Sequence, residues 1–129
     1  MQRRLGRNLL DRLHHALGGG ALAGSLGIAP TGNIDPERRY PSMFEPIHGS
    51  AFDIMGKGLA NPIGTFWSVV MLLEHLGEGA AAERVMQAIE QVTAEPALHT
   101  RDLGGSATTA QVTQAACARL TAAVARRAA

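Results

Sequence analysis

The sequence lacks what several large protein classes require. Its single cysteine, Cys117, excludes a disulfide framework and a cysteine-based zinc site, so a reducing, cytoplasmic environment is expected. A net charge of +1 gives no reason to expect a nucleic-acid partner. The longest apolar run, residues 69–73, is far too short to cross a bilayer, so no membrane partner is expected either. What is present, 129 residues that are 46% hydrophobic and 18% charged, is typical of one modest globular domain.

The first 17 residues are more basic than the rest of the chain. They hold four arginines and one acidic residue, Asp11, and leucine recurs at every fourth position from Leu5 to Leu17. If helical, this segment is a basic amphipathic helix. It could be a targeting presequence or a membrane-surface helix. We favour a surface helix or a spurious start to a truncated reading frame, because serine and a cleavage signal are absent.

Strands are nearly absent from the predicted elements. Residues 18–40 are rich in Gly, Pro and Asn, which indicates a loop with at most one short strand. A second candidate strand at 44–47 is confined to an edge or a strand end by Pro41 and Pro46.

Three helices are indicated much more strongly. The first spans 61–77, with Asn61 as N-cap, Pro62 at the first helical position and Gly77 just past its end. The second spans 79–95 and stops before a proline. The third follows a capping box at 108–111. The apolar residues of the first helix recur at helical spacing, at Phe66, Val69, Val70, Leu73 and Leu76, and those of the second are Val85, Met86, Ile89 and Val92. Both helices are apolar enough to need a partner layer, and the chain supplies little sheet to cover them.

Three short motifs do not have the context that their chemistry needs. The glycine pattern at 18–23 fits the loose dinucleotide fingerprint, but it follows a basic helical stretch instead of a strand. The sequence at 23–27 approaches a nucleophile elbow, yet nothing places His and Asp in a triad, so a tight turn is the better interpretation. His14 and His15 are adjacent, which turns them to different helix faces and argues against a metal site.

The irregular stretch at 41–62 is different, because long loops in compact domains are usually functional. Its polar residues suit a nucleoside: Asp53 can accept hydrogen bonds from both ribose hydroxyls, and His48 and Asn61 can stack on adenine and bind it. Gly49 allows a close approach of the backbone to a ligand. A well hydrogen-bonded surface loop is the alternative, and the residues alone leave both open.

The same stretch resembles the adenosine loop of the isocitrate/isopropylmalate dehydrogenase family. The likeness covers about residues 20–120, and its motifs lie in family order at 24–30, 41–54, 58–62, 71–77 and 102–109. Residues 33–38 resemble the tartrate/D-malate dehydrogenase branch more than the isopropylmalate branch. The resemblance implies the fold class: α/β, helix-rich, the C-terminal portion of an isopropylmalate-dehydrogenase-like domain at 18–129, lacking most of its sheet.

The family's properties can be carried onto individual positions. Its members are homodimers that oxidise a malate-like 2-hydroxyacid with NAD and Mg²⁺ or Mn²⁺, sometimes with decarboxylation, and their dinucleotide site is not of the Rossmann type. The resemblance places His48 against adenine, Asn61 at its edge, and Asp53 on the ribose hydroxyls, where a carboxylate selects NAD over NADP. The resemblance implies that three further residues line the same pocket: Gly49, Ser50 and Ala51.

Two departures from the family limit what this chain is expected to do. Phe52 stands where the family usually has proline. The family helix that carries two metal-binding aspartates corresponds to residues 8–17. Aligned forward from Asn8, the two aspartate positions are Arg12 and Ala16, and aligned back from Gly27 they are Leu13 and Leu17, so Mg²⁺ or Mn²⁺ is not expected to bind. The catalytic Tyr and Lys of the family precede this segment, and Tyr40 and Lys57 do not match them.

The expected protein is therefore a C-terminal fragment of an NAD-dependent oxidoreductase that keeps the adenosine loop and is inactive alone. We expect a truncated or frameshifted remnant, or one piece of a split gene. The alternative is a binding module without a cofactor. Either is expected to form a homo-oligomer or to associate with an intact homologue.

Overall fold

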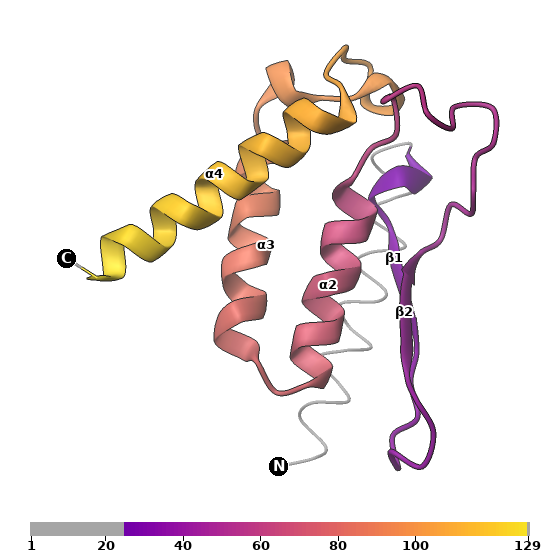
Figure 1. Cartoon of the computed structure of the whole chain (residues 1–129), viewed down its shortest axis with the longest axis vertical. Coiled ribbons are helices and arrows are strands. Elements are labelled where there is room, and N and C mark those ends of the chain that lie inside the picture. The colour runs from indigo at the N-terminus through magenta and orange to yellow at the C-terminus, as the bar shows by residue number, and fades with distance from the viewer. Residues whose placement is uncertain (1–24, 129) are drawn as a thin grey trace.

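The described part of the chain consists of a β-hairpin packed beside three long helices (Figure 1). The computed structural model describes residues 25–128, so the basic segment at 1–17 lies outside it. The elements follow in the order η1 (Leu26–Ile28), β1 (Pro30–Asn33), β2 (Met43–Pro46), α2 (Ile63–His75), α3 (Gly79–Thr93), η2 (Pro96–Leu98), η3 (Arg101–Leu103) and α4 (Thr109–Ala128). The predicted helix-rich α/β architecture with little sheet is confirmed for these residues. No helix among them is long and apolar enough to span a bilayer.

Prolines mark one end of the hairpin, as the predicted edge position requires. β1 and β2 are antiparallel, with Pro30 opposite Pro46 and Asn33 opposite Met43. Proline has no N–H to donate to a ladder, so it is tolerated at the ends of these strands. The far end of the hairpin is tied to the C-terminal end of α2, because the Arg38 guanidinium donates to a helix carbonyl at 3.0 Å. Both strands of the hairpin therefore lie alongside α2 (Figure 1).

Helix α2 has the predicted start and end signals. The Asn61 side-chain oxygen accepts a hydrogen bond from the backbone N–H of Ile63 at 3.0 Å, and the helix begins at Ile63, one residue later than expected. At the other end Gly77 has a φ of 86°, and the N–H of Glu78 donates to the carbonyl of Leu73 at 2.8 Å. This is a Schellman motif, which satisfies carbonyls that the helix end leaves open.

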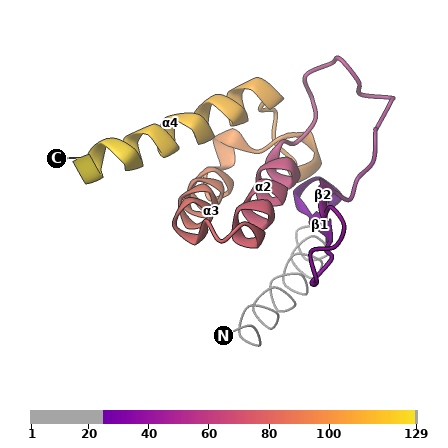
Figure 2. The ribbon, with the colours of Figure 1, turned by 60° about the horizontal axis from the view of Figure 1, so that its bottom comes forward.

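The hydrophobic core lies where α2, α3 and α4 meet. Val70, Val92 and Val112, one from each helix, are each 1% exposed, and Ile89 is 4% exposed. Burial of each such side chain stabilises the fold by about 1.5–3 kcal/mol. Figure 2 shows α2 and α3 side by side, with α4 running across them. The predicted apolar side of α3 is therefore the side that forms the core.

The apolar side predicted for α2 is only partly correct. Val70 is buried, but Val69 and Leu76, placed on the same side from the sequence, are 39% and 60% exposed. Together with Leu72, at 38%, they form a stripe at positions 69, 72 and 76, here called the outer stripe of α2. The reason is that α2 is apolar on more sides than α3 and the hairpin can cover.

Candidate functional site

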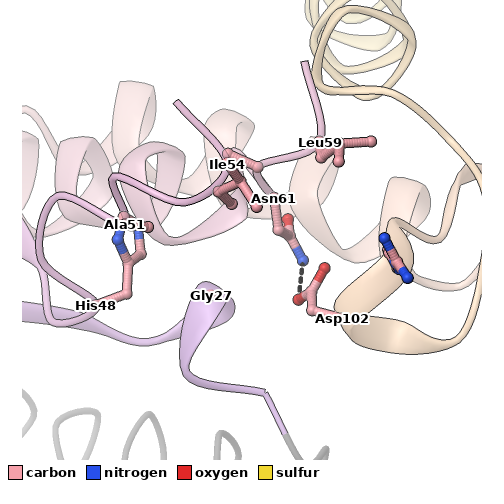
Figure 3. Close-up of a pocket in the computed structure, with 9 residues that line it drawn as sticks. Gly27, His48, Ala51, Ile54, Leu59, Asn61 and Asp102 are labelled. Atoms are coloured by element: carbon pink, nitrogen blue, oxygen red, sulfur yellow. Dashed lines mark hydrogen bonds between the residues drawn. The ribbon is translucent and has the colours of Figure 1, made fainter. Parts of the chain in front are cut away.

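A cavity of about 330 Å³ lies between η1, the loop after β2 and η3 (Figure 3). Most of its wall is apolar, and its polar groups come from a few positions. The residues that line it are Gly27, His48, Ala51, Ile54, Leu59, Ala60, Asn61, Arg101 and Asp102. An apolar pocket with a few convergent polar groups is the usual form of a small-molecule site.

The loop at 47–60 reaches the cavity through unusual backbone conformations. Gly49 has a φ of 67° and Gly58 a φ of 66°, values that favour glycine. Ala51 also has a positive φ, 43°, which is uncommon for a residue with a side chain. Such residues cluster at functional sites, where the surrounding structure holds the strain. The position of Ala51 on the cavity wall agrees with this pattern.

The carboxylate of Asp102 joins three chain segments at the cavity wall. Its Oδ2 accepts hydrogen bonds from the Ser25 hydroxyl at 2.5 Å and the Asn61 amide at 3.0 Å, and its Oδ1 accepts one from the Thr100 hydroxyl at 2.5 Å. All three donor residues are buried, at 5%, 7% and 1% exposure. Figure 3 shows the Asn61 amide directed at this carboxylate.

The hydrogen bonds keep this carboxylate charged. Partial burial of the carboxylate raises the pKa of Asp102, but the bonds from Ser25, Thr100 and Asn61 outweigh it and hold the pKa below its ordinary value. Most of the Asp102 residue is exposed to solvent. The partial burial that affects its pKa is that of the carboxylate, which faces the buried donors. The cavity wall therefore carries a negative charge, and both oxygens of this carboxylate already accept hydrogen bonds.

Gly27 completes this part of the wall because it has no side chain. A β-carbon at position 27 would lie 3.0 Å from an Asp102 carboxylate oxygen and 3.2 Å from the β-carbon of Asn61. Any larger residue would crowd the hydrogen-bonded group. The glycine at this position thus permits η1 to pack directly on the Asn61–Asp102 pair.

The structure brings together some of the residues predicted from sequence and not others. His48, Ala51 and Asn61 line the cavity. The other predicted contacts, Gly49, Ser50 and Asp53, are exposed on the loop and are not among the lining residues. The His48 ring nitrogen Nδ1 lies 2.7 Å from the Gly49 carbonyl oxygen, within hydrogen-bond distance. The roles of all six toward a nucleotide stay predictions.

Both charged residues that line the cavity, Arg101 and Asp102, lie outside the set predicted from the sequence. Asp102 lies 77 positions from Ser25 and 41 from Asn61, so their contact cannot be inferred from local spacing. The available signal was the turn at 102–106, a motif of charged and glycine residues shared with the family. This turn can be recognised as part of the site only once the fold has brought it to the cavity.

The donor set of the described residues does not fit a metal ion. Among residues 25–128, no group of three or more His, Cys, Asp and Glu side chains lies close enough to hold one. The segment at 8–17, which corresponds to the metal-binding helix of the family, lies outside the described residues.

Comparison with known proteins gives a consistent result. The sequence model described as isocitrate/isopropylmalate dehydrogenase matches residues 19–124. A probable tartrate dehydrogenase/decarboxylase from Agrobacterium vitis is 69% identical over 98 residues, which are 76% of this chain and 27% of the relative. The D-malate dehydrogenase [decarboxylating] of Escherichia coli (strain K12) is 49% identical over 104 residues, 77% of this chain and 28% of the relative.

Solved structures agree with the sequence comparison. A beta-decarboxylating dehydrogenase from Thermococcus kodakarensis superposes with a TM-score of 0.72 at 38% identity, covering 82% of this chain and 30% of that one. An isocitrate dehydrogenase from Methylococcus capsulatus gives a TM-score of 0.69 at 37% identity, covering 75% and 28%. The chain spans about 27% of the length of the curated relatives that it matches. The predicted likeness to the tartrate/D-malate branch and to part of this fold is confirmed.

Proposed function

Since this chain belongs to the isocitrate/isopropylmalate dehydrogenase family, we propose that residues 18–129 are the C-terminal portion of an NAD-dependent 2-hydroxyacid dehydrogenase and form the adenosine half of its NAD site. The observation that carries the proposal is the cavity, because His48, Ala51 and Asn61 all line it. Its volume of about 330 Å³ is in the range of small-molecule sites. The relatives named for tartrate and D-malate support a malate-like substrate: tartrate, D-malate or 3-isopropylmalate, with possible decarboxylation.

The chemistry of the cavity wall suits an adenine ring. Ile54 and Leu59 offer apolar surface to a flat base, and the His48 imidazole can stack on it. The Asn61 amide donates one of its two N–H groups to Asp102, which leaves the other N–H for a ring nitrogen. Asp53 lies on the exposed loop beside these residues, where its carboxylate could accept from ribose hydroxyls.

The residues of this chain are suited to only one part of the reaction, the binding of the cofactor. NAD, when bound, supplies the hydride acceptor for oxidation of the hydroxyl group. The proposed tasks of this chain are to bind the adenosine end and to hold it with the strained loop and the Asp102 network. Hydride transfer also needs the substrate and nicotinamide held together by a preorganised site. Tyr40 and Lys57 do not match the catalytic Tyr and Lys of the family, so we expect no turnover by residues 18–129 alone.

A second candidate function is a binding module that carries no cofactor and associates with an intact homologue or with a second copy of itself. The outer stripe of α2 favours it, because three large apolar side chains at 69, 72 and 76 are exposed in a row. Phe52 and Met55 add exposed apolar surface on the loop, at 76% and 62%. The two candidates are compatible, since an adenosine half-site completed by a partner would need both surfaces.

Calorimetric titration of NAD into the purified 129-residue chain tests the proposal. Saturable binding is expected, and Asp53→Ala should weaken it by removing the proposed ribose acceptor. Circular dichroism on both proteins verifies that the helices are formed. A folded chain that shows no heat of binding at millimolar NAD would refute the adenosine half-site and leave the module without a cofactor.

A further inference from the structure

The hairpin has an open edge along β2. Within residues 25–128 the sheet has two strands, so β2 pairs with β1 on one side only. At the end of the hairpin the Ile47 N–H donates to the Ala29 carbonyl at 3.2 Å. Successive residues of an antiparallel strand alternate between bonding the neighbouring strand and pointing away from it. Phe44 lies an odd number of positions before Ile47, so its N–H and C=O point away from β1. Such unpaired groups are a template for another strand.

The open edge of β2 lies on the side of the hairpin nearer to the outer stripe of α2. Met71 of α2 lies against β1, because a β-carbon on Gly32 would be 3.2 Å from its methyl group. His75 lies against β2, where the centroids of its ring and the Phe44 ring are 5.5 Å apart. Four residues turn a helix by about 400°, so position 75 points about 40° closer to the outer stripe than position 71 does. The open edge and the stripe therefore border each other.

The open edge is complementary to itself. If two β2 strands run antiparallel with Phe44 opposite its counterpart, each Phe44 N–H donates to the Phe44 carbonyl of the other copy. In the same register the Ser42 N–H meets the carbonyl of Pro46 of the second copy. Because Pro46 has no N–H, each end of this ladder has one hydrogen bond instead of two. The groups that one edge presents are thus the groups that a second copy of the same edge requires.

The spacing of the elements lets the outer stripes meet as well. Since α2 contacts both strands of the hairpin, pairing of two β2 strands would set the two α2 helices about two strand spacings, roughly 9.6 Å, apart. Packed helices lie about 8–10 Å apart. The stripe points sideways along the sheet, about 100° around α2 from the positions that face the hairpin, and α3 lies on another side of α2 (Figure 2). The stripe has no charged residue, so two copies can bury it without burying a charge.

We infer that two copies of this chain associate through the open edges of β2, which joins their hairpins into one continuous sheet and packs the outer stripes of α2 against each other. The inference rests on the self-association proposed above and specifies its interface. Because Phe44 faces α2, its neighbours Met43 and Glu45 lie on the other face of the sheet, where Met43 is 52% exposed and Glu45 is exposed. In this register Met43 of each copy lies opposite Glu45 of the other, so the two carboxylates do not face each other directly.

Disulfide trapping tests this register. Met43→Cys and Glu45→Cys are made separately, each with Cys117→Ala, because Cys117 is exposed and would react. Opposed residues of an antiparallel pair have Cα atoms about 4.5–5.5 Å apart, within the reach of a disulfide, whereas identical positions of the two copies would be about 8 Å apart. Under mild oxidation, a mixture of the two variants should give about 10-fold more disulfide-linked dimer on a non-reducing gel than either variant alone. Equal yields would overturn the β2 pairing.

Charge substitutions at position 43 test the same contact without a cross-link. Met43→Glu places a carboxylate opposite Glu45 of each copy, and Met43→Lys places an ammonium group there. Analytical ultracentrifugation should give a dimer dissociation constant about 10-fold higher for Met43→Glu than for Met43→Lys, and the difference should shrink as salt rises. Asn33→Glu is the matched control. It adds a carboxylate to the same sheet face, but on β1 and away from the open edge, and should leave the dissociation constant near the wild-type value.

Circular dichroism should show the same helix content for every variant. A chain that dimerises with equal dissociation constants for Met43→Glu and Met43→Lys would overturn the pairing of the β2 edges while self-association stands. A wild-type chain that is monomeric at every concentration tested would overturn both. The titration of NAD tests the adenosine site separately, so neither result bears on it.

Discussion

At the scale of single residues, Asp102 connects parts of the chain that are distant in sequence. Replacing it with asparagine keeps the size of the side chain but removes its charge and one of its two acceptor oxygens. At least one donor among Ser25, Asn61 and Thr100 then loses its partner. We expect Asp102→Asn to reduce the free energy of unfolding by about 1 kcal/mol, as measured by urea denaturation. Asp53→Asn is the control: it makes the same chemical change at an exposed loop position and should be neutral.

The effect of Asp102→Asn should depend on pH in a defined direction. Although partial burial raises the pKa of Asp102, its hydrogen bonds outweigh this and hold the pKa below the ordinary value, so the native state favours the charged form. Its contribution is complete above the unfolded-state pKa, about 3.9, and is lost as pH falls through the lower native-state pKa. The difference in the free energy of unfolding between wild type and Asp102→Asn should therefore be constant near neutral pH and disappear below about pH 4.

Asp35 is another acidic residue of the described part of the chain whose pKa is lowered. The backbone N–H of Tyr40, followed by those of Glu37 and Arg39, holds the pKa of Asp35 below its ordinary value at the tip of the hairpin. Because Asp35 is present in both proteins, its titration cancels in the difference between them. If the difference in unfolding free energy between wild type and Asp102→Asn grew toward acid pH, the effect could not be assigned to the Asp102 carboxylate.

At the scale of elements, the contact between α2 and η1 depends on a glycine. A β-carbon on Gly64 would lie 2.7 Å from the carbonyl oxygen of Gly27, a backbone atom that cannot turn away. Gly64→Ala should therefore push α2 from η1 and destabilise the fold by about 1–3 kcal/mol. Gly79→Ala, at the start of α3 where nothing lies within 4 Å, should be neutral or slightly stabilising. Thermal or urea unfolding of both variants measures the contrast, and equal stability for the pair would refute this packing argument.

Gly27 is also a cavity residue, so the same contact links stability to the site. A displaced η1 would move the wall beside Asn61 and Asp102. Gly64→Ala is therefore expected to weaken adenosine binding even under conditions where the protein remains folded, although Gly64 itself does not line the cavity.

At the scale of the whole molecule, the outer stripe of α2 predicts association. Large apolar side chains in a row on a surface helix usually mark an interface. Sedimentation of the purified chain is expected to show a dimer or larger species at micromolar concentration. Replacing Leu72 and Leu76 together with lysine should shift it toward monomer. Gln91→Lys, on an exposed position of α3, is the control and should leave the distribution unchanged. A wild-type chain that sediments only as a monomer would contradict self-association.

Local signals were sufficient to predict the helices. Asn61, Gly77 and the Thr108–Gln111 capping box act within a few residues of their own position, and the structure shows the expected hydrogen bonds at all three. The helix boundaries agree within two residues for the same reason. The family likeness was equally readable, since its motifs are long and follow one another along the chain.

The composition of the cavity wall and the exposed side of α2 were decided by tertiary structure. The loop at 41–62 was a candidate site from the sequence, but the sequence did not indicate that Gly27, Arg101 and Asp102 line the same cavity, because they reach it from η1 and η3. Likewise, helical periodicity marks Val69 and Leu76 as apolar without indicating which neighbour covers them. The sequence by itself determined the elements, their caps and the family. Which distant residues meet, and which apolar side stays uncovered, depends on long-range packing that no local pattern encodes.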